Sequence, residues 1–167
     1  MPEELRGELS GEGLEVGIVV SRWNGEITES LLKGALRALL AVGVAESKIS
    51  IIRVPGAFEI PLALEKLASH TLCNVLVALG CVIRGETTHF EHVSNAAMIG
   101  IREVSLRQGI PVGLGVLTTE TVEQAWQRAQ DNEENKGSEA ALAAVEMASL
   151  IRKLVDSNPF RSLIDNA

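Results

Sequence analysis

Residues 74–90 read N-V-L-V-A-L-G-C-V-I-R-G-E-T-T-H-F, and this stretch decides the fold that the sequence predicts. Its first half, which reaches Gly80, is an almost unbroken apolar run, typical of a strand buried on both faces of a parallel sheet. Its second half passes through Arg84 and two threonines to His89, which indicates a turn that leads into a helix. A strand-to-helix turn of this kind is suited to binding an anion.

The start of that helix carries the residues expected around an anion. Thr88 and Glu91 have the spacing of a capping box, so the positive helix end and its free N–H groups would face the ligand. His89 would lie beside the anion as a group that titrates near neutral pH. An ordinary helix cap with an exposed histidine explains this segment equally well, so the rest of the chain has to decide.

The alternation of short apolar runs with longer helical patterns along the 167 residues predicts the fold. We expect strands at about residues 15–21, 48–54, 74–80 and 110–117, each buried on both faces. Helices are expected at about residues 27–42, 58–69, 89–108, 121–129 and 138–154. Right-handed crossovers then give a flavodoxin-like α/β fold, a three-layer αβα sandwich around a central, mainly parallel four-stranded sheet.

Composition limits the class of protein. With 46% apolar residues, residues 1–167 are expected to form a single domain, with residues 1–13 as a flexible or partner-bound tail and residues 156–167 as a short irregular extension. The formal net charge of −7 disfavours nucleic acid and anionic membranes as partners. No apolar run reaches the roughly 18 residues of a membrane span and no signal peptide is evident, so we expect a cytoplasmic protein.

Metal and cofactor sites are not expected. Cys73 and Cys81 are outside any C-x-x-C pattern, which favours two buried reduced thiols. His89 and His92 are three residues apart, but a catalytic zinc needs three convergent ligands. The glycine-rich patterns that bind dinucleotides and nucleoside triphosphates are missing from the sequence.

Trp23 is the most informative residue outside the anion turn. Ligands of doubly wound sheets bind beyond the carboxyl ends of the strands, and Trp23 follows the first expected strand. The chain has two Trp, three Phe and no Tyr, so an exposed indole suggests stacking on a planar heterocycle. A tryptophan folded back into the core is the competing interpretation.

Four motifs in this order resemble one family: R-W-N-G-E-I-T at residues 22–28, V-P-G-A-F-E-I-P at 54–61, G-C-V-I-R-G-E-T-T-H-F at 80–90, and P-V-G-L-G-V-L-T-T-E-T-V-E-Q-A-W-Q-R-A at 111–129 with N-K-G after it. They resemble the 6,7-dimethyl-8-ribityllumazine synthases over about residues 14–154. The resemblance implies a transferase of riboflavin biosynthesis that needs no cofactor. Such an enzyme condenses 5-amino-6-(D-ribitylamino)uracil with 3,4-dihydroxy-2-butanone 4-phosphate, releasing phosphate and water.

The resemblance also implies the roles of individual residues. His89 would be the catalytic proton donor and acceptor. The residues implied for the ribitylaminouracil are Trp23, Ala57, Phe58, Glu59, Cys81, Val82, Ile83 and Leu114, the last at a position where many relatives carry phenylalanine. The residues implied for the butanone phosphate are Glu86, Thr87 and Arg128, and further candidate positions are Asn24, Gly85 and Lys136.

Members of this family assemble as pentamers or as icosahedral shells of sixty subunits, with each active site between adjacent subunits. The resemblance therefore implies at least a homopentamer, and riboflavin synthase is a candidate partner. The linker at residues 130–134 is acidic, unlike the small turn of shell-forming relatives. Two alternatives stay open: a non-catalytic flavin- or lumazine-binding relative, which would be expected to lack His89 or Arg128, and a primarily shell-forming relative.

Overall fold

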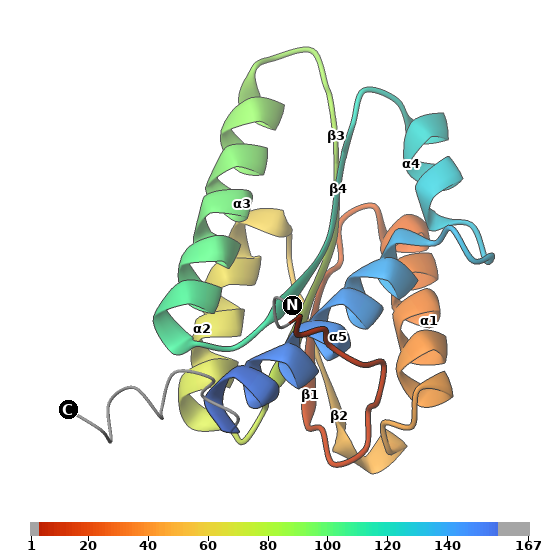
Figure 1. The fold of residues 1–167 in the computed structure, drawn as a ribbon. Helices are drawn as coiled ribbons and strands as arrows, with labels where there is room; N and C mark the ends of the chain where they lie inside the picture. The colour runs from red at the N-terminus through yellow and green to blue at the C-terminus, as the bar shows by residue number, and fades with distance from the viewer. Residues whose placement is uncertain (1–3, 157–167) are drawn as a thin grey trace.

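Four parallel strands form the centre of the part of the chain that the computed structural model describes, residues 4–156 (Figure 1). Their order in the sheet is β2-β1-β3-β4. The strands are β1 (Val16–Ser21), β2 (Ile49–Val54), β3 (Val75–Ile83) and β4 (Val112–Thr119). The helices are α1 (Gly25–Ala41), α2 (Ile60–His70), α3 (His89–Gln108), α4 (Val122–Ala129) and α5 (Lys136–Asp156), with 3₁₀ turns at Glu46–Lys48 and Ala57–Glu59.

Helices cover both faces of the sheet, as the predicted three-layer sandwich requires. Figure 1 shows α2 and α3 on one side and α1, α4 and α5 on the other. Successive residues of β1 alternate between the two cores: Ile18 and Val20 pack with α1 and α5, whereas Val19 packs with α2 and α3. This alternation follows from the two-residue repeat of a strand, and it confirms the predicted flavodoxin-like α/β fold.

The edge strand β4 exposes Leu114, and the other edge strand, β2, departs further from the predicted burial. Ser50 and Arg53 are exposed, and Ile51 and Ile52 are 41% and 37% exposed. The prediction that this strand is buried on both faces is therefore wrong for the single chain. Because β2 is the outermost strand, only β1 pairs with it, and its apolar side chains lie beyond the helices that cover the centre.

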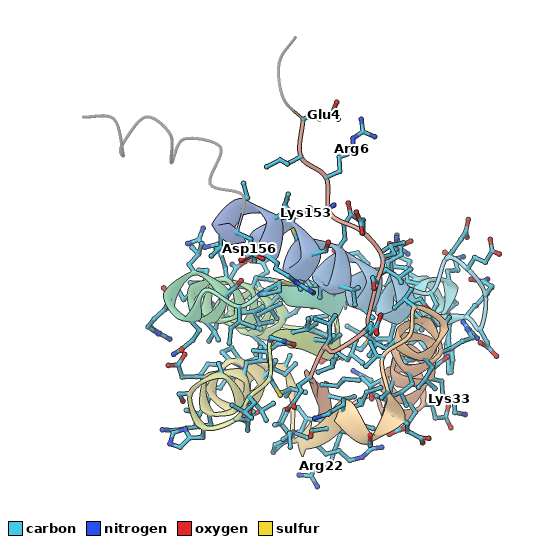
Figure 2. The ribbon with its side chains drawn as sticks, turned by 60° about the horizontal axis from the view of Figure 1, so that its bottom comes forward. Glu4, Arg6, Arg22, Lys33, Lys153 and Asp156 are labelled. Atoms are coloured by element: carbon cyan, nitrogen blue, oxygen red, sulfur yellow. The ribbon has the colours of Figure 1, made fainter. Side chains whose placement is uncertain are left out.

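The amino-terminal segment lies along its own α5 (Figure 2). The main-chain N–H of Glu8 donates to the Ser149 hydroxyl at 3.1 Å, and the Glu8 carboxylate pairs with Lys153 at 2.6 Å. Further along, the N–H of Gly11 donates to the main-chain oxygen of Val42 at 2.7 Å. Residues 6–11 thus contact their own chain, in the segment for which the sequence predicts a flexible or partner-bound tail. Residues 157–167 of the predicted carboxyl-terminal extension lie outside the described residues.

Asn135 joins α1, α4 and α5 through its buried side chain. Its amide nitrogen donates to three main-chain oxygens, those of Ser30 (3.2 Å), Ala129 (3.1 Å) and Gln130 (2.9 Å). Its oxygen accepts the N–H groups of Gly137 (2.9 Å) and Ser138 (3.1 Å), which start α5. This cap explains why α5 begins at Lys136, two residues before the predicted start.

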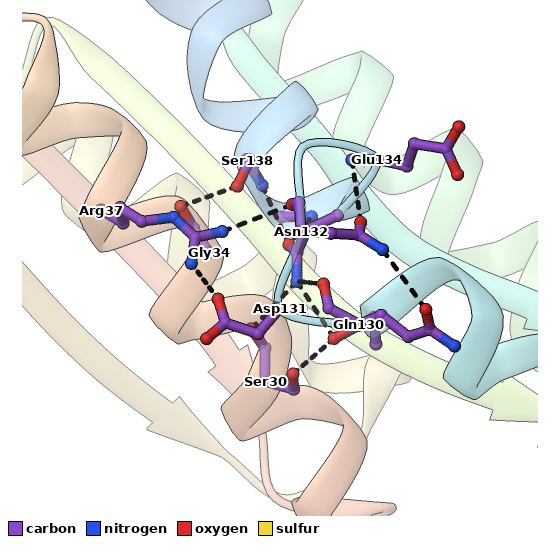
Figure 3. Close-up of polar contacts among 11 residues, drawn as sticks. Ser30, Gly34, Arg37, Gln130, Asp131, Asn132, Glu134 and Ser138 are labelled. Carbon is purple, nitrogen blue, oxygen red and sulfur yellow. Dashed lines mark hydrogen bonds and ion pairs between the residues drawn. The ribbon is translucent and has the colours of Figure 1, made fainter.

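The α4–α5 loop and the start of α5 make further contacts with α1 (Figure 3). Arg37 pairs with Asp131 and donates to the main-chain oxygen of Asn132 at 3.4 Å. The Ser138 hydroxyl donates to the main-chain oxygen of Gly34 at 2.9 Å. The acidic linker is therefore an ordered connection that is held against α1.

Asn135→Ala should lower the free energy of unfolding by about 3 to 5 kcal/mol, because it leaves several buried main-chain groups without partners. Asn132→Ala, three residues earlier in the exposed part of the same loop, should cost less than about 1 kcal/mol. Urea unfolding of both variants provides the measurement. Equal costs would mean that the Asn135 bonds contribute no more than an exposed loop contact.

Candidate active site

The turn after β1 presents Trp23 to the solvent. The N–H of Trp23 donates to the main-chain oxygen of Pro55 at 3.0 Å, which ties this turn to the end of β2. Asn24 adopts the left-handed conformation with φ of 56°, and its side-chain nitrogen donates to the main-chain oxygen of Cys81 at 2.9 Å. The Trp23 indole lies against Gly56, where a Cβ atom would come within 2.4 Å of the ring, and Trp23 is 64% exposed. The interpretation of Trp23 as a core residue is therefore wrong.

The segment after β2 forms the next wall of the site. The Glu59 carboxylate accepts the N–H of Gly56 at 2.9 Å and so caps the short 3₁₀ turn that precedes α2. Within this turn Ala57 is buried against the sheet, whereas Phe58 is 62% exposed. The predicted helix at residues 58–69 begins instead with this turn, which places the side chains of Phe58 and Glu59 at the carboxyl edge.

Two neighbouring cavities at this edge share Trp23, His89 and Val93. The larger cavity, of about 360 Å³, is lined by Trp23, Phe58, Glu59, His89, His92 and Val93. The smaller cavity, of about 200 Å³, is lined by Trp23, Asn24, Ala57, Cys81, Val82, Ile83, His89 and Val93. The structure thus brings together most of the residues that the sequence predicts around a planar ring, and His89 lies beside them.

Val93 and His92 were not predicted as site residues. His92 lies three and Val93 four positions after His89 on α3, so the helical repeat turns all three toward the same cavity. The i+3 and i+4 spacing was the signal in the sequence that could have identified them.

The predicted capping box at the start of α3 does not form. Thr88 is the N-cap but has helical backbone angles (φ −70°, ψ −1°), and its side chain makes no capping hydrogen bond. The Glu91 carboxylate pairs with Arg84 at 3.2 Å, so a cation has replaced the expected main-chain partner. The N–H of His89 donates to the Thr87 hydroxyl at 3.4 Å instead. Gly85, Glu86 and Thr87 are all exposed on this turn.

Three other predicted site residues line separate cavities. Arg128 and Lys136 line a cavity of about 350 Å³, in which Arg128 donates to the main-chain oxygen of Gln124 at 2.9 Å and Lys136 pairs with Glu139 at 2.7 Å. Leu114 lies on the edge strand β4, 53% exposed, in a groove of about 760 Å³ between α3 and α5. In residues 4–156 of a single chain, these three side chains do not line the two cavities that include His89.

Both cysteines are free and buried, as predicted. Burial raises the pKa of the Cys81 thiol to about 11. In residues 4–156, no group of three His, Cys, Asp or Glu side chains is arranged to hold a metal ion. The helices in the same range are all too short or too polar to span a membrane.

The fold and the site define a flavodoxin-like α/β protein with an aromatic-walled pocket at the carboxyl edge of its sheet and a histidine beside that pocket. Residues 13–152 match the family described as 6,7-dimethyl-8-ribityllumazine synthase. The chain therefore belongs to this lumazine synthase family of riboflavin biosynthesis.

The raised pKa of Cys81 predicts a loss of stability in alkali. The thiol is favoured in the folded state, so its contribution is complete below the ordinary pKa of 9.0 and is lost as the pH rises toward about 11. About two pKa units correspond to about 3 kcal/mol. Cys81→Ala should therefore lose less unfolding free energy than the unmodified protein between these pH values. If urea titrations show that both proteins lose the same unfolding free energy between these pH values, the role of Cys81 is contradicted.

Proposed function

We propose that this protein catalyses the condensation of 5-amino-6-(D-ribitylamino)uracil with 3,4-dihydroxy-2-butanone 4-phosphate to give 6,7-dimethyl-8-ribityllumazine. The observation that carries the proposal is the cavity that Trp23, Phe58, Glu59 and His89 line together. An aromatic amine and a ketone react readily, so the site has to orient them, transfer protons and stabilise the leaving phosphate.

The pyrimidine ring stacks on the Trp23 indole in this proposal. An exposed indole held against Gly56 offers one flat face without reorganisation, which suits a planar heterocycle. One Glu59 oxygen accepts from Gly56, which fixes the carboxylate at the cavity wall, and the ribityl hydroxyls donate to the other oxygen. Because Asn24 already donates to the oxygen of Cys81, and Val82 pairs with Thr118 of β4, the main chain of Ile83 is better suited to bind the polar ring edge.

His89 transfers protons in the proposed mechanism. Imine formation, elimination of phosphate and ring closure each move a proton, and His89 borders both cavities at the first residue of α3. The exposed turn with Gly85, Glu86 and Thr87 precedes it and offers N–H and hydroxyl groups to the phosphate. The Glu86 carboxylate points away from that anion, because two negative groups repel each other.

Arg128 serves the site of a neighbouring subunit in the proposed homopentamer. Its cavity is separate from that of His89 within one chain. The groove beside β4 exposes Leu106, Leu114 and Met147 at 76%, 53% and 45%, and a second copy of the chain would cover these apolar side chains. Lys136 lines both this groove and the Arg128 cavity and adds a positive charge there.

A larger shell, an association with riboflavin synthase and a cytoplasmic location remain predictions. A lumazine synthesis assay with both purified substrates, combined with a mass measurement of the native protein, tests the central proposal. Formation of 6,7-dimethyl-8-ribityllumazine by the purified protein is expected. Binding of lumazine without turnover would favour the non-catalytic alternative.

His89→Ala should lower kcat by about 10- to 1,000-fold while the affinity for the uracil substrate stays nearly unchanged, because general acid–base catalysis contributes on this scale. His70→Ala is a matched control, since His70 is exposed at the carboxyl end of α2 and lines neither cavity. Turnover of His89→Ala at the unmodified rate would remove His89 from the proton-transfer role.

Arg128→Ala should raise KM for the butanone phosphate far more than KM for the uracil, because the lost guanidinium binds only the phosphate. Mixed pentamers of the two impaired variants, His89→Ala and Arg128→Ala, should contain an intact site at about one quarter of their positions at equal mixing and should exceed the summed activity of the parents. Each variant is first shown to assemble by native mass measurement. If assembled mixtures have only the summed activity of the two parents, the site is not shared between subunits.

A further inference from the structure

Arg84, the first residue after β3, is enclosed by two carboxylates and an aromatic ring. Its Nε lies 2.7 Å from the Glu120 carboxylate, and its Nη2 lies 3.2 Å from the Glu91 carboxylate. The centre of the guanidinium group lies 4.9 Å from the centroid of the Phe90 ring. These partners come from the first turn of α3 and from the residue after β4.

The two carboxylates already compensate the positive charge of Arg84. Hydrogen bonds to Glu91 and then to Glu120 raise the pKa of its guanidinium above the ordinary value. Arg128, by contrast, donates to a neutral main-chain oxygen. A phosphate at Arg84 would compete with two carboxylates, so Arg84 is a poor direct ligand for an anion although it adjoins the turn implied in phosphate binding.

The contacts of Arg84 connect the two ends of the turn at residues 85–88. Its main-chain N–H donates to the main-chain oxygen of Thr119 at 2.9 Å. Its side chain donates to the Glu91 carboxylate, which follows the exposed residues 85–88 in the chain. Glu120 joins the same guanidinium from the connection after β4, and Figure 1 shows β3 and β4 side by side with both connections leaving the same edge of the sheet. One side chain therefore links the turn before His89 to a second strand end.

The same link continues to α4. The N–H of Glu120 donates to the side-chain oxygen of Gln124 at 2.9 Å, and the main-chain oxygen of Gln124 accepts from Arg128 at 2.9 Å. The turn before His89 and the helix that carries Arg128 are thus connected within one chain by consecutive polar contacts.

We propose that Arg84 is a positioning residue that holds residues 85–88 in the conformation that binds the phosphate of the substrate, acting through Glu91 and Glu120 and without touching the phosphate. This inference rests on the proposed function. Exposed turns lose conformational freedom when they order around a ligand, and a link that orders the turn beforehand lowers that cost.

Kinetics of Arg84→Gln and Glu120→Gln separate positioning from direct binding. A positioning role predicts that each variant raises KM for the butanone phosphate by about tenfold or more, with KM for the uracil within about twofold. A direct role predicts the opposite for Glu120→Gln, because removing the competing carboxylate frees the guanidinium for phosphate. Unchanged or lower KM for the butanone phosphate in Glu120→Gln would therefore overturn the proposal.

Three further variants complete the design. The double variant Arg84→Gln/Glu120→Gln should bind the butanone phosphate no more weakly than Arg84→Gln alone, because both changes break one link. Arg84→Lys keeps the charge but lacks the planar fork, so its KM should be intermediate. Arg107→Gln breaks the Arg107–Glu65 pair (2.9 Å) at the other end of α3 and should leave both KM values unchanged. A KM rise in this control equal to that of Arg84→Gln would overturn the specific role of Arg84.

Amide hydrogen exchange tests the inference independently of turnover. The amides of His89 and Glu91, which donate to the Thr87 hydroxyl (3.4 Å) and to the main-chain oxygen of Thr88 (3.0 Å), should exchange faster in Arg84→Gln than in the unmodified protein, while the amides of β1 keep their protection. Equal exchange of these two amides would overturn the positioning role even in an active enzyme. If the unmodified protein forms no lumazine but the exchange difference appears, the proposed function fails and the link between Arg84 and the turn still stands.

Discussion

The parallel pairing of β1 with β3 is the constraint on which the rest of the structure depends. Both strands are buried on both faces, so their apolar side chains leave little freedom in register, and Val16 pairs with Val75 through to Val20 with Leu79. Parallel strands end at the same edge, which brings the turn of Trp23 and the turn of His89 together although 66 residues separate them. The bond from Asn24 to the oxygen of Cys81 closes this edge between the two strands.

Features that follow from local periodicity could be predicted from the sequence. Apolar runs identified the four strands, and the rule that ligands bind beyond the carboxyl ends of parallel strands identified Trp23 and His89 as neighbours. The edge position of β2 was not predictable from its composition, because Ile51 and Ile52 have the same apolar character whether or not a helix covers them. Burial depends on strand order, which a run of isoleucines does not encode.

Polar contacts between distant segments account for the other differences between the predicted and the observed structure. The spacing of Thr88 and Glu91 favours a capping box, but Glu91 pairs with Arg84 instead. Arg84 also pairs with the carboxylate of Glu120, which follows another strand. In the folded chain Glu91 pairs with Arg84 and not with the main chain of Thr88, so a tertiary contact replaces the local cap that the spacing favours. Asn135 is a similar case, since its amide joins segments that are far apart in the sequence.

The distribution of charge supports the proposal that two chains share the phosphate site. The protein carries a net charge of −7, and Glu91 and Glu120 neutralise the arginine nearest to the turn before His89. A dianionic substrate therefore needs positive charge from elsewhere, and Arg128 and Lys136 lie together in a separate cavity. In the proposed homopentamer a neighbouring subunit supplies this positive charge to the turn. Electrostatics within the single chain thus supports the proposal of a shared site.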